Sequence, residues 1–136
     1  MDSEEIKVVK AFIAAINQGD VSLLAGLMTE DHTFVDSGGR TTAGREKMKK
    51  GWEEYYRAFP DYRVIIEEVL QDGNLVAAFG SCSGTYNGKR GLVPENRIAM
   101  PAAWKAIVEN GKIKCWQVYA DWTEGSKIID EDSAFS

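Results

Sequence analysis

The sequence predicts one α+β domain in which helices come first and strands follow, and two observations carry this prediction. Before Pro60, apolar residues recur three and four positions apart, which is the spacing of one helical face. After Pro60, runs rich in β-branched and aromatic residues alternate with short turns that contain glycine. The chain has 136 residues, of which 44% are hydrophobic and 27% are charged, as in an ordinary single globular domain.

Three helices are expected in the first half of the chain. Ser3 precedes two acidic residues that suit the first turn of a helix. Gly19 can adopt the left-handed conformation that ends a helix, and Asp20 is a suitable N-cap for the next helix. Pro60 ends the third helix because it lacks the amide hydrogen that a helix interior needs. The predicted helices span residues 3–17, 21–28 and 44–59.

Five strands are expected, the first of them between the second and third helices. The predicted strands span residues 32–36, 62–70, 75–86, 98–108 and 113–122. The last four should form consecutive antiparallel strands, because only short turns separate most of them. We expect a loop over residues 88–96, a domain that covers residues 1–123, and a polar, poorly ordered tail at 124–136.

The turn at residues 109–111 decides which side chains of the last two strands share a face. A two-residue turn would set Trp104 opposite Gln117 and mix polar with apolar positions on both faces. A three-residue turn with Gly111 in the left-handed position gives one apolar face, so we expect that turn. The expected cross-strand pairs are Trp104–Trp116, Ala102–Val118 and Met100–Ala120.

The opposite face of these two strands is amphipathic rather than polar. It would carry Pro101, Ala103, Lys105, Ile107, Cys115, Gln117, Tyr119 and Asp121. Such a face is expected to meet a second copy of the chain in a two-fold homodimer, and a covering loop or tail is the alternative.

Charge and motifs exclude several classes of partner and cofactor. A net charge of -5 with scattered basic residues gives no footprint for nucleic acid or a membrane surface. The acidic N-terminus does not resemble a secretory signal, so we expect a cytoplasmic protein whose Cys82 and Cys115 are unpaired. With one histidine and no phosphate-binding or dinucleotide motif, we expect no metal and no cofactor.

The order of elements resembles the nuclear transport factor 2-like superfamily, which includes ketosteroid isomerases, limonene epoxide hydrolases and SnoaL-like polyketide cyclases. The resemblance covers residues 5–122 and implies a cone-shaped, curved, mostly antiparallel sheet packed on three N-terminal helices and enclosing a pocket. The segments that carry it are FIAAINQGD (12–20), EDHTFVD (30–36), GRE (44–46) and NGKI (110–113) before Trp116.

The resemblance also points to a candidate acid or base. Asp36 matches the general-base aspartate of the isomerases, and a carboxylate at the mouth of an apolar pocket can shuttle a proton beside a carbonyl. The alternative is that Asp36 only caps the turn that follows it.

The isomerases' tyrosine on the first helix matches Phe12, which lacks a hydroxyl, so ordinary ketosteroid isomerisation is not expected. The late aspartate of the epoxide hydrolases matches Val118, so their chemistry is not expected either.

His32 is the second catalytic candidate, because it should share the inward face with Phe34 and Asp36; a structural histidine is the alternative. The residues expected to line the pocket are Phe12, Phe34, Trp52, Tyr56, Met100, Trp104, Trp116 and Val118. The predicted function is binding of a small apolar cyclic ligand, with isomerase-like or cyclase-like acid/base chemistry through Asp36. A non-catalytic binding or dimerisation module of the same fold is the alternative.

Overall fold

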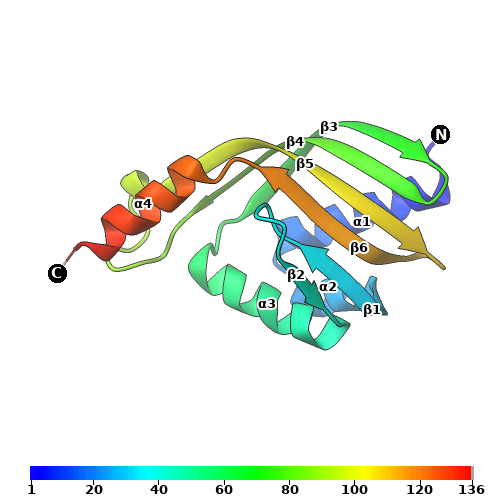
Figure 1. Cartoon of the computed structure of the whole chain (residues 1–136), viewed down its shortest axis with the longest axis horizontal. Helices are drawn as coiled ribbons and strands as arrows, with labels where there is room; N and C mark the ends of the chain where they lie inside the picture. Colours follow the sequence, from blue (N-terminus) through cyan, green and yellow to red (C-terminus); the bar gives the residue numbers. More distant parts are fainter. Residues whose placement is uncertain (136) are drawn as a thin grey trace.

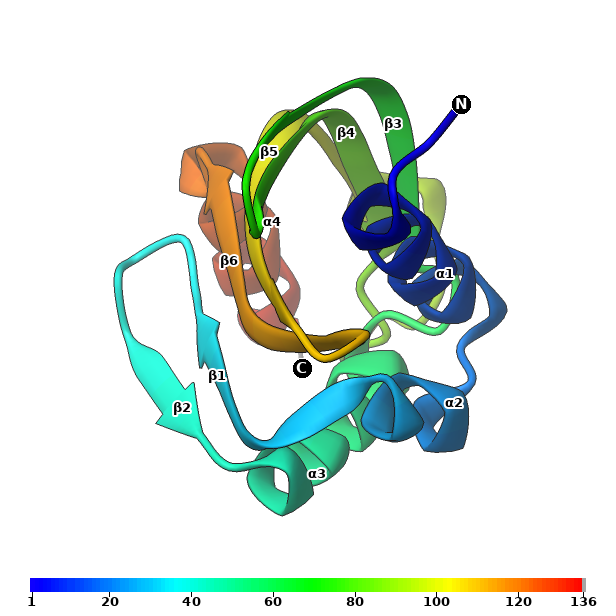
Figure 2. The same cartoon turned by 90° about the vertical axis from the view of Figure 1, so that its right-hand side faces the viewer.

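The computed structural model describes residues 1–135. They form a curved sheet whose concave side faces the three N-terminal helices (Figures 1 and 2). The helices are α1 (Glu4–Gln18), α2 (Val21–Gly26), α3 (Arg45–Ala58) and α4 (Thr123–Ser133), with a short 3₁₀ helix at Pro94–Asn96. The strands are β1 (Met28–Val35), β2 (Thr41–Ala43), β3 (Arg63–Asp72), β4 (Leu75–Thr85), β5 (Arg97–Glu109) and β6 (Lys112–Ala120). Their order in the sheet is β2-β1-β6-β5-β4-β3. The predicted α+β cone is confirmed.

Helix α1 lies inside the curve of the sheet (Figure 2). It begins where the Ser3 side chain accepts a hydrogen bond of 3.1 Å from the amide of Ile6, and it ends at Gly19, whose φ of 67° is left-handed. Val9, Phe12 and Ile16 are buried on the face that meets the sheet. No helix among residues 1–135 is long and apolar enough to cross a membrane.

The first strand is longer than predicted, and a second short strand accompanies it. Met28, expected in the second helix, starts β1 and pairs in parallel with Ile113 of β6. Strand β2 was not predicted; it folds back on β1 after the turn at residues 36–40, and Val35 pairs with Thr41. Its three residues are too few to show a period-two pattern, so the sequence did not predict this strand.

The four-stranded antiparallel meander is present, but its last register was predicted wrongly. Asn110 and Gly111 both have positive φ and form a two-residue turn that pairs Glu109 with Lys112. A bulge on β6 then adds one residue opposite Ile107 and Val108. The observed pairs are therefore Trp104–Val118, Ala106–Trp116 and Ala102–Ala120.

The predicted inner face is nevertheless observed. The two-residue turn alone would place each β6 side chain on the opposite face relative to its β5 partner, and the one-residue bulge reverses this change. Trp104, Ala102 and Trp116 are buried on the concave side, while Pro101 and Tyr119 are exposed on the other. Lys114 sits at the bulge and forms ion pairs with Asp31 and Glu109.

The segment after residue 123 is a helix, so the prediction of a poorly ordered tail was wrong. Asp132 of α4 is 1% exposed, and its carboxylate accepts hydrogen bonds from the backbone amides of Lys89 (2.7 Å) and Arg90 (2.9 Å) and from the Asn96 side chain (3.0 Å). These partners lie far away in the sequence, so local patterns could not reveal them. In Figure 1, α4 lies beyond the end of the sheet, beside the segment at residues 86–96.

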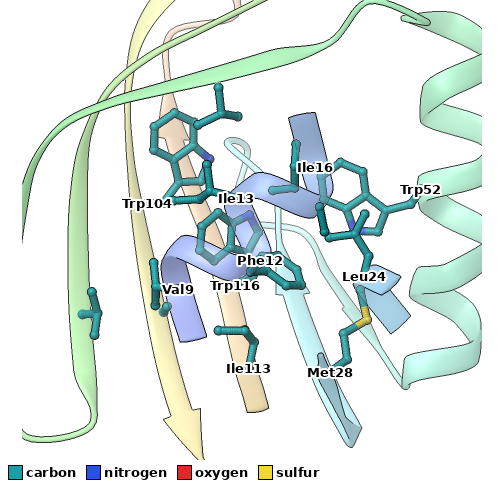
Figure 3. Packing of buried hydrophobic residues seen from close by; sticks show 14 of the residues in the cluster. Val9, Phe12, Ile13, Ile16, Leu24, Met28, Trp52, Trp104, Ile113 and Trp116 are labelled. Carbon is teal, nitrogen blue, oxygen red and sulfur yellow. The ribbon is translucent and has the colours of Figure 1, made fainter. Parts of the chain in front are cut away.

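The core joins α1 to the middle of the sheet (Figure 3). The Phe12 ring lies 4.9 Å from the Trp116 ring, and Trp116 stacks on Trp104 at 6.4 Å with an interplanar angle of 22°. Ile113, Leu24 and Met28 are fully buried around them. This core fills one part of the concave space and leaves another part open.

Candidate functional site

A cavity of about 550 Å³ occupies the open part of the concave side. Its walls come from α3, from the ends of β1 and β6, from the inner faces of β4 and β5, and from the first turn of α4. The lining residues therefore range from Phe34, near the end of β1, to Ser126 of α4.

Aromatic side chains form most of the apolar wall. Trp104 and Trp116 line it from the sheet, Phe34 from β1, and Trp52 and Tyr55 from α3. The Trp52 and Tyr55 rings meet edge to face at 5.9 Å and 85°. Figure 3 shows Trp52 on α3 across from Trp104 on the sheet. Broad rings on two sides suit a flat, apolar ligand.

Asp36 lines the cavity at its rim and also caps the following turn, so both sequence interpretations describe its geometry. One carboxylate oxygen, Oδ1, accepts hydrogen bonds of 2.9 Å from the amides of Gly38 and Arg40. The side chain is 40% exposed, and Oδ2 lies 3.8 Å from Nε of Arg40. The turn therefore fixes the carboxylate through one oxygen and leaves Oδ2 without a backbone donor among residues 1–135.

His32 lies in the core and does not line the cavity. Its ring is fully buried beside Phe12, with the ring centroids 6.2 Å apart. Nδ1 lies 2.7 Å from the carbonyl oxygen of Ile113, which can only accept, so Nδ1 carries the proton. Burial lowers the pKa of the ring and keeps it neutral. Because the hydrogen bond of the His32 side chain joins β1 to β6, we assign it the structural role.

The predicted lining residues divide into two groups. The structure places Phe34, Trp52, Trp104, Trp116 and Val118 on the cavity wall. Three others do not line this cavity. Phe12 is fully buried in the core, the Tyr56 hydroxyl donates a 2.6 Å hydrogen bond to the carbonyl of Ile16, and Met100 lines a small neighbouring void. The face assignment placed Met100 correctly on the concave side but could not show how far along β5 the cavity extends.

Sequence reasoning missed polar groups of the wall other than Asp36. Tyr55, Tyr62 and Cys82 line the cavity together, and the Tyr55 and Tyr62 rings meet edge to face at 4.8 Å and 89°. Burial raises the pKa of both phenols and of the thiol, so all three stay protonated at neutral pH. Tyr55 follows Trp52 by three positions on α3, and that spacing was the available signal. The remaining side chains that sequence reasoning missed are Ser37, Arg40, Thr42, Met48, Trp122 and Ser126.

A cone-shaped α+β domain with a cavity on its concave side defines a protein of the nuclear transport factor 2-like class. The sequence model of the SnoaL-like domain family matches residues 9–116, and the chain belongs to this family. No curated protein matches the chain.

Solved structures share the fold at low sequence identity. A candidate SnoaL-like polyketide cyclase from Shewanella denitrificans OS-217 is 16% identical, with a TM-score of 0.80 over 93% of this chain and 97% of that one. A hypothetical protein with a ketosteroid isomerase-like fold from Catenulispora acidiphila DSM 44928, in complex with trimethylamine, is 23% identical, with a TM-score of 0.76 over 93% and 92%. TerC, co-crystallised with polyporic acid, is 19% identical, with a TM-score of 0.79 over 94% and 99%. At these identities the likeness shows the fold alone.

Proposed function

We propose that the cavity binds a small, largely apolar cyclic compound between α3 and the sheet, and that Asp36 acts on it as a general acid or base. One observation carries the proposal: a cavity of about 550 Å³ has aromatic walls and a single acid at its rim. Ligand pockets in proteins measure roughly 300–1,000 Å³ and combine apolar walls with a few placed polar groups. No cofactor is required for this function.

The geometry of Asp36 suits proton transfer. The two amide hydrogen bonds to Oδ1 hold the carboxylate in place without occupying Oδ2. A positioned carboxylate can take a proton from a carbon beside a carbonyl group and return it elsewhere on the same molecule. Isomerase-like and cyclase-like reactions both need such a step. The family and the candidate cyclase among its structural neighbours support this proposal.

The test combines ligand binding with turnover. Cyclic ketones, lactones and aromatic polyketides are screened by thermal shift, and every binder is assayed with wild-type protein and with Asp36→Asn. The asparagine side-chain oxygen can still accept the two amide hydrogen bonds, so the turn should persist while the charge is lost. We expect binding to remain and turnover to fall by about 10²–10⁴-fold. Asp72→Asn, at the exposed end of β3, is the matched control.

Two further variants test the aromatic wall. Trp104→Ala should weaken binding, and Trp104→Phe, which keeps a ring in this buried position, should weaken it less. If no compound raises the melting temperature of the wild type, the binding proposal is wrong. If compounds bind but none is turned over, a non-catalytic binding module is the better description.

The outer face of the sheet favours a second function, association into a homodimer. Phe79, Ala103 and Tyr119 lie side by side in one row across β4, β5 and β6. Phe79 is 41% exposed and Tyr119 is 49% exposed. We propose that a second copy covers this row through a two-fold axis.

We further propose a cytoplasmic location, where the free thiols of Cys82 and Cys115 would stay reduced.

A further inference from the structure

Helix α4 extends beyond the end of the sheet and is held to the rest of the domain at two points (Figure 1). Among residues 123–133, the buried positions are Gly125 near the start of the helix and Asp132 near its end. A helix of 11 residues that contains a glycine is marginally stable by itself in water. These two contacts therefore decide whether α4 stays folded against the domain.

The contact at the start of α4 is part of the cavity wall. The Trp122 ring packs against Phe59, with the ring centroids 6.0 Å apart and an interplanar angle of 65°. Gly125 lies so close to the Trp122 ring that a Cβ atom at this glycine would overlap it. Trp122 and Cys82 both line the cavity and the small void beside it, and Ser126 also lines the cavity. Displacement of this part of α4 would therefore open the wall beside Cys82.

The contact at the end of α4 is a buried carboxylate that accepts hydrogen bonds. The Asp132 carboxylate accepts from the backbone amides of Lys89 and Arg90 and from the Asn96 side chain, and Nε of Arg90 lies 3.7 Å from Oδ1. A Cβ atom at Gly88 would overlap Oδ2, so the glycine makes room for the carboxylate. Hydrogen bonds to a charged group are about twice as strong as those between neutral groups. None of these five residues lines the cavity, so this contact can be changed without altering the cavity wall.

We propose that α4 is a lid on the cavity and that Asp132 is the latch that holds the lid closed. Release of the latch would let Trp122 and Ser126 leave the wall, so that a ring compound can enter or leave at this place. The closed lid would keep water away from the bound compound. The purpose of the lid rests on the proposed binding function, but its opening needs no ligand and can be measured without one.

The test measures how fast the Cys82 thiol reacts with N-ethylmaleimide, followed by mass spectrometry. Cys82 is 4% exposed and lies beside Trp122 on the wall, so the reagent should reach it when the lid opens. The chain has two cysteines, and Cys115→Ser makes Cys82 the single reactive thiol of the parent protein. Asp132→Asn removes the charge of the latch. Asp130→Asn, on the exposed side of the same helix, is the matched control.

Asp132→Asn should label about 10- to 100-fold faster than the parent, because the hydrogen bonds to a charged group are weakened in the closed state. Asp130→Asn should label within about twofold of the parent, since an exposed charge contributes little. Low concentrations of urea should change these rates only weakly, because the opening of one helix exposes little surface. If Asp132→Asn labels at the parent rate, or if Asp130→Asn accelerates labelling equally, the lid is wrong. It is also wrong if the acceleration rises with urea as steeply as global unfolding does, since Asp132 would then stabilise the whole domain.

A second pair of variants tests the contact at the start of α4. Gly125→Ala favours a helical backbone but forces the Trp122 ring to move, so labelling of Cys82 should become faster. Lys127→Ala, at an exposed position of the same helix, also favours the helix and meets no such overlap, so labelling should not become faster. If Gly125→Ala labels no faster than Lys127→Ala, this contact does not close the wall and the lid is wrong. None of these measurements uses a ligand, so failure of the lid leaves the proposed function to its own test by thermal shift and turnover.

Discussion

The side chain of His32 joins β1 to β6 through one hydrogen bond in a place that water does not reach. Its position two residues before Phe34 suggested an inward-facing acid or base. The inward direction is observed, but the ring enters the packed core beside Phe12 instead of the cavity. Protonation of the buried His32 ring should therefore change the stability of the fold rather than catalysis.

The stability of the protein should fall on acidification because of His32. Burial lowers the folded pKa below the unfolded value of 6.5, so the unfolded chain binds a proton more readily. The stability that the neutral His32 ring contributes is therefore fully present above pH 6.5 and is lost as the pH falls toward the folded pKa. The free energy of unfolding should decline by up to about 1.4 kcal/mol per pH unit in that window.

Chemical denaturation between pH 7.5 and 5 measures this effect, and His32→Asn is the comparison. The asparagine amide can still donate to the Ile113 carbonyl but does not titrate in this range. The difference in unfolding free energy between wild type and variant should shrink as pH falls. A constant difference across the range would contradict the buried, neutral state of the ring.

The sequence predicted one part of the site better than the other, for a reason that individual residues show. Trp104 and Trp116 were placed correctly because alternation along a strand fixes which side chains share a face. Tyr62 was missed because it lies in a connection, where no period applies. Phe12 lies in the core and Trp116 also lines the cavity, although both are buried and inward, because three-dimensional packing decides where the core ends and the cavity begins.

At the scale of elements, the helices and the four-stranded meander followed from periodicity and turn residues. The register of β5 and β6 did not, because a bulge depends on long-range packing rather than on local pattern. The separation of apolar from polar side chains predicted the correct inner face but the wrong turn. A bulge and a three-residue turn each add one residue between the paired positions, so both leave the same side chains on the inner face. Helix α4 was missed because its ordering depends on distant partners of Asp132.

Gly80 allows β3 to approach β4 closely at a second bulge, between Ile66 and Glu68. A Cβ atom at Gly80 would overlap the carbonyl oxygen of Ile65, a backbone atom that cannot rotate away. Gly80→Ala should therefore lower the unfolding free energy by about 1–3 kcal/mol or more. Gly26→Ala is the control, since a Cβ there meets nothing within 4 Å and alanine favours helix α2. Equal unfolding free energies for the two variants, measured in urea, would show that the close approach is not rigid.

Asp132 should determine whether α4 stays attached to the segment at residues 86–96. Burial acts to raise the pKa of its carboxyl, but hydrogen bonds from Arg90, Asn96 and Lys89 outweigh it and lower the pKa, which shows that they favour the charged form. Asp132→Asn removes the charge and turns one acceptor into a donor facing other donors. Amide hydrogen exchange should become faster in residues 123–133 and 86–96. Asp130→Asn, on the exposed side of α4, should leave the exchange unchanged; if it has the same effect, helix charge rather than this contact orders α4.

At the scale of the whole molecule, the two proposed functions lie on opposite faces of one curved sheet. The concave face holds the core and the cavity, and the convex face carries the row formed by Phe79, Ala103 and Tyr119. Because strand side chains alternate between faces, a change on one face need not disturb the other. Association and ligand binding should therefore be separable by mutation.

Phe79→Glu should dissociate the proposed homodimer and leave the cavity intact. Association would bury the new carboxylate without a partner, which costs about 3 kcal/mol or more and should weaken the dimer by at least about 100-fold. Sedimentation velocity at micromolar concentration should give twice the mass of one chain for the wild type and the mass of one chain for this variant. Leu92→Glu, an exposed leucine on the segment at residues 86–96, is the matched control and should remain dimeric. A monomeric wild type would contradict the proposed homodimer. A dimer that Leu92→Glu dissociates and Phe79→Glu does not would place the association surface away from the convex face, because a buried, unpaired charge weakens association only where the two copies meet.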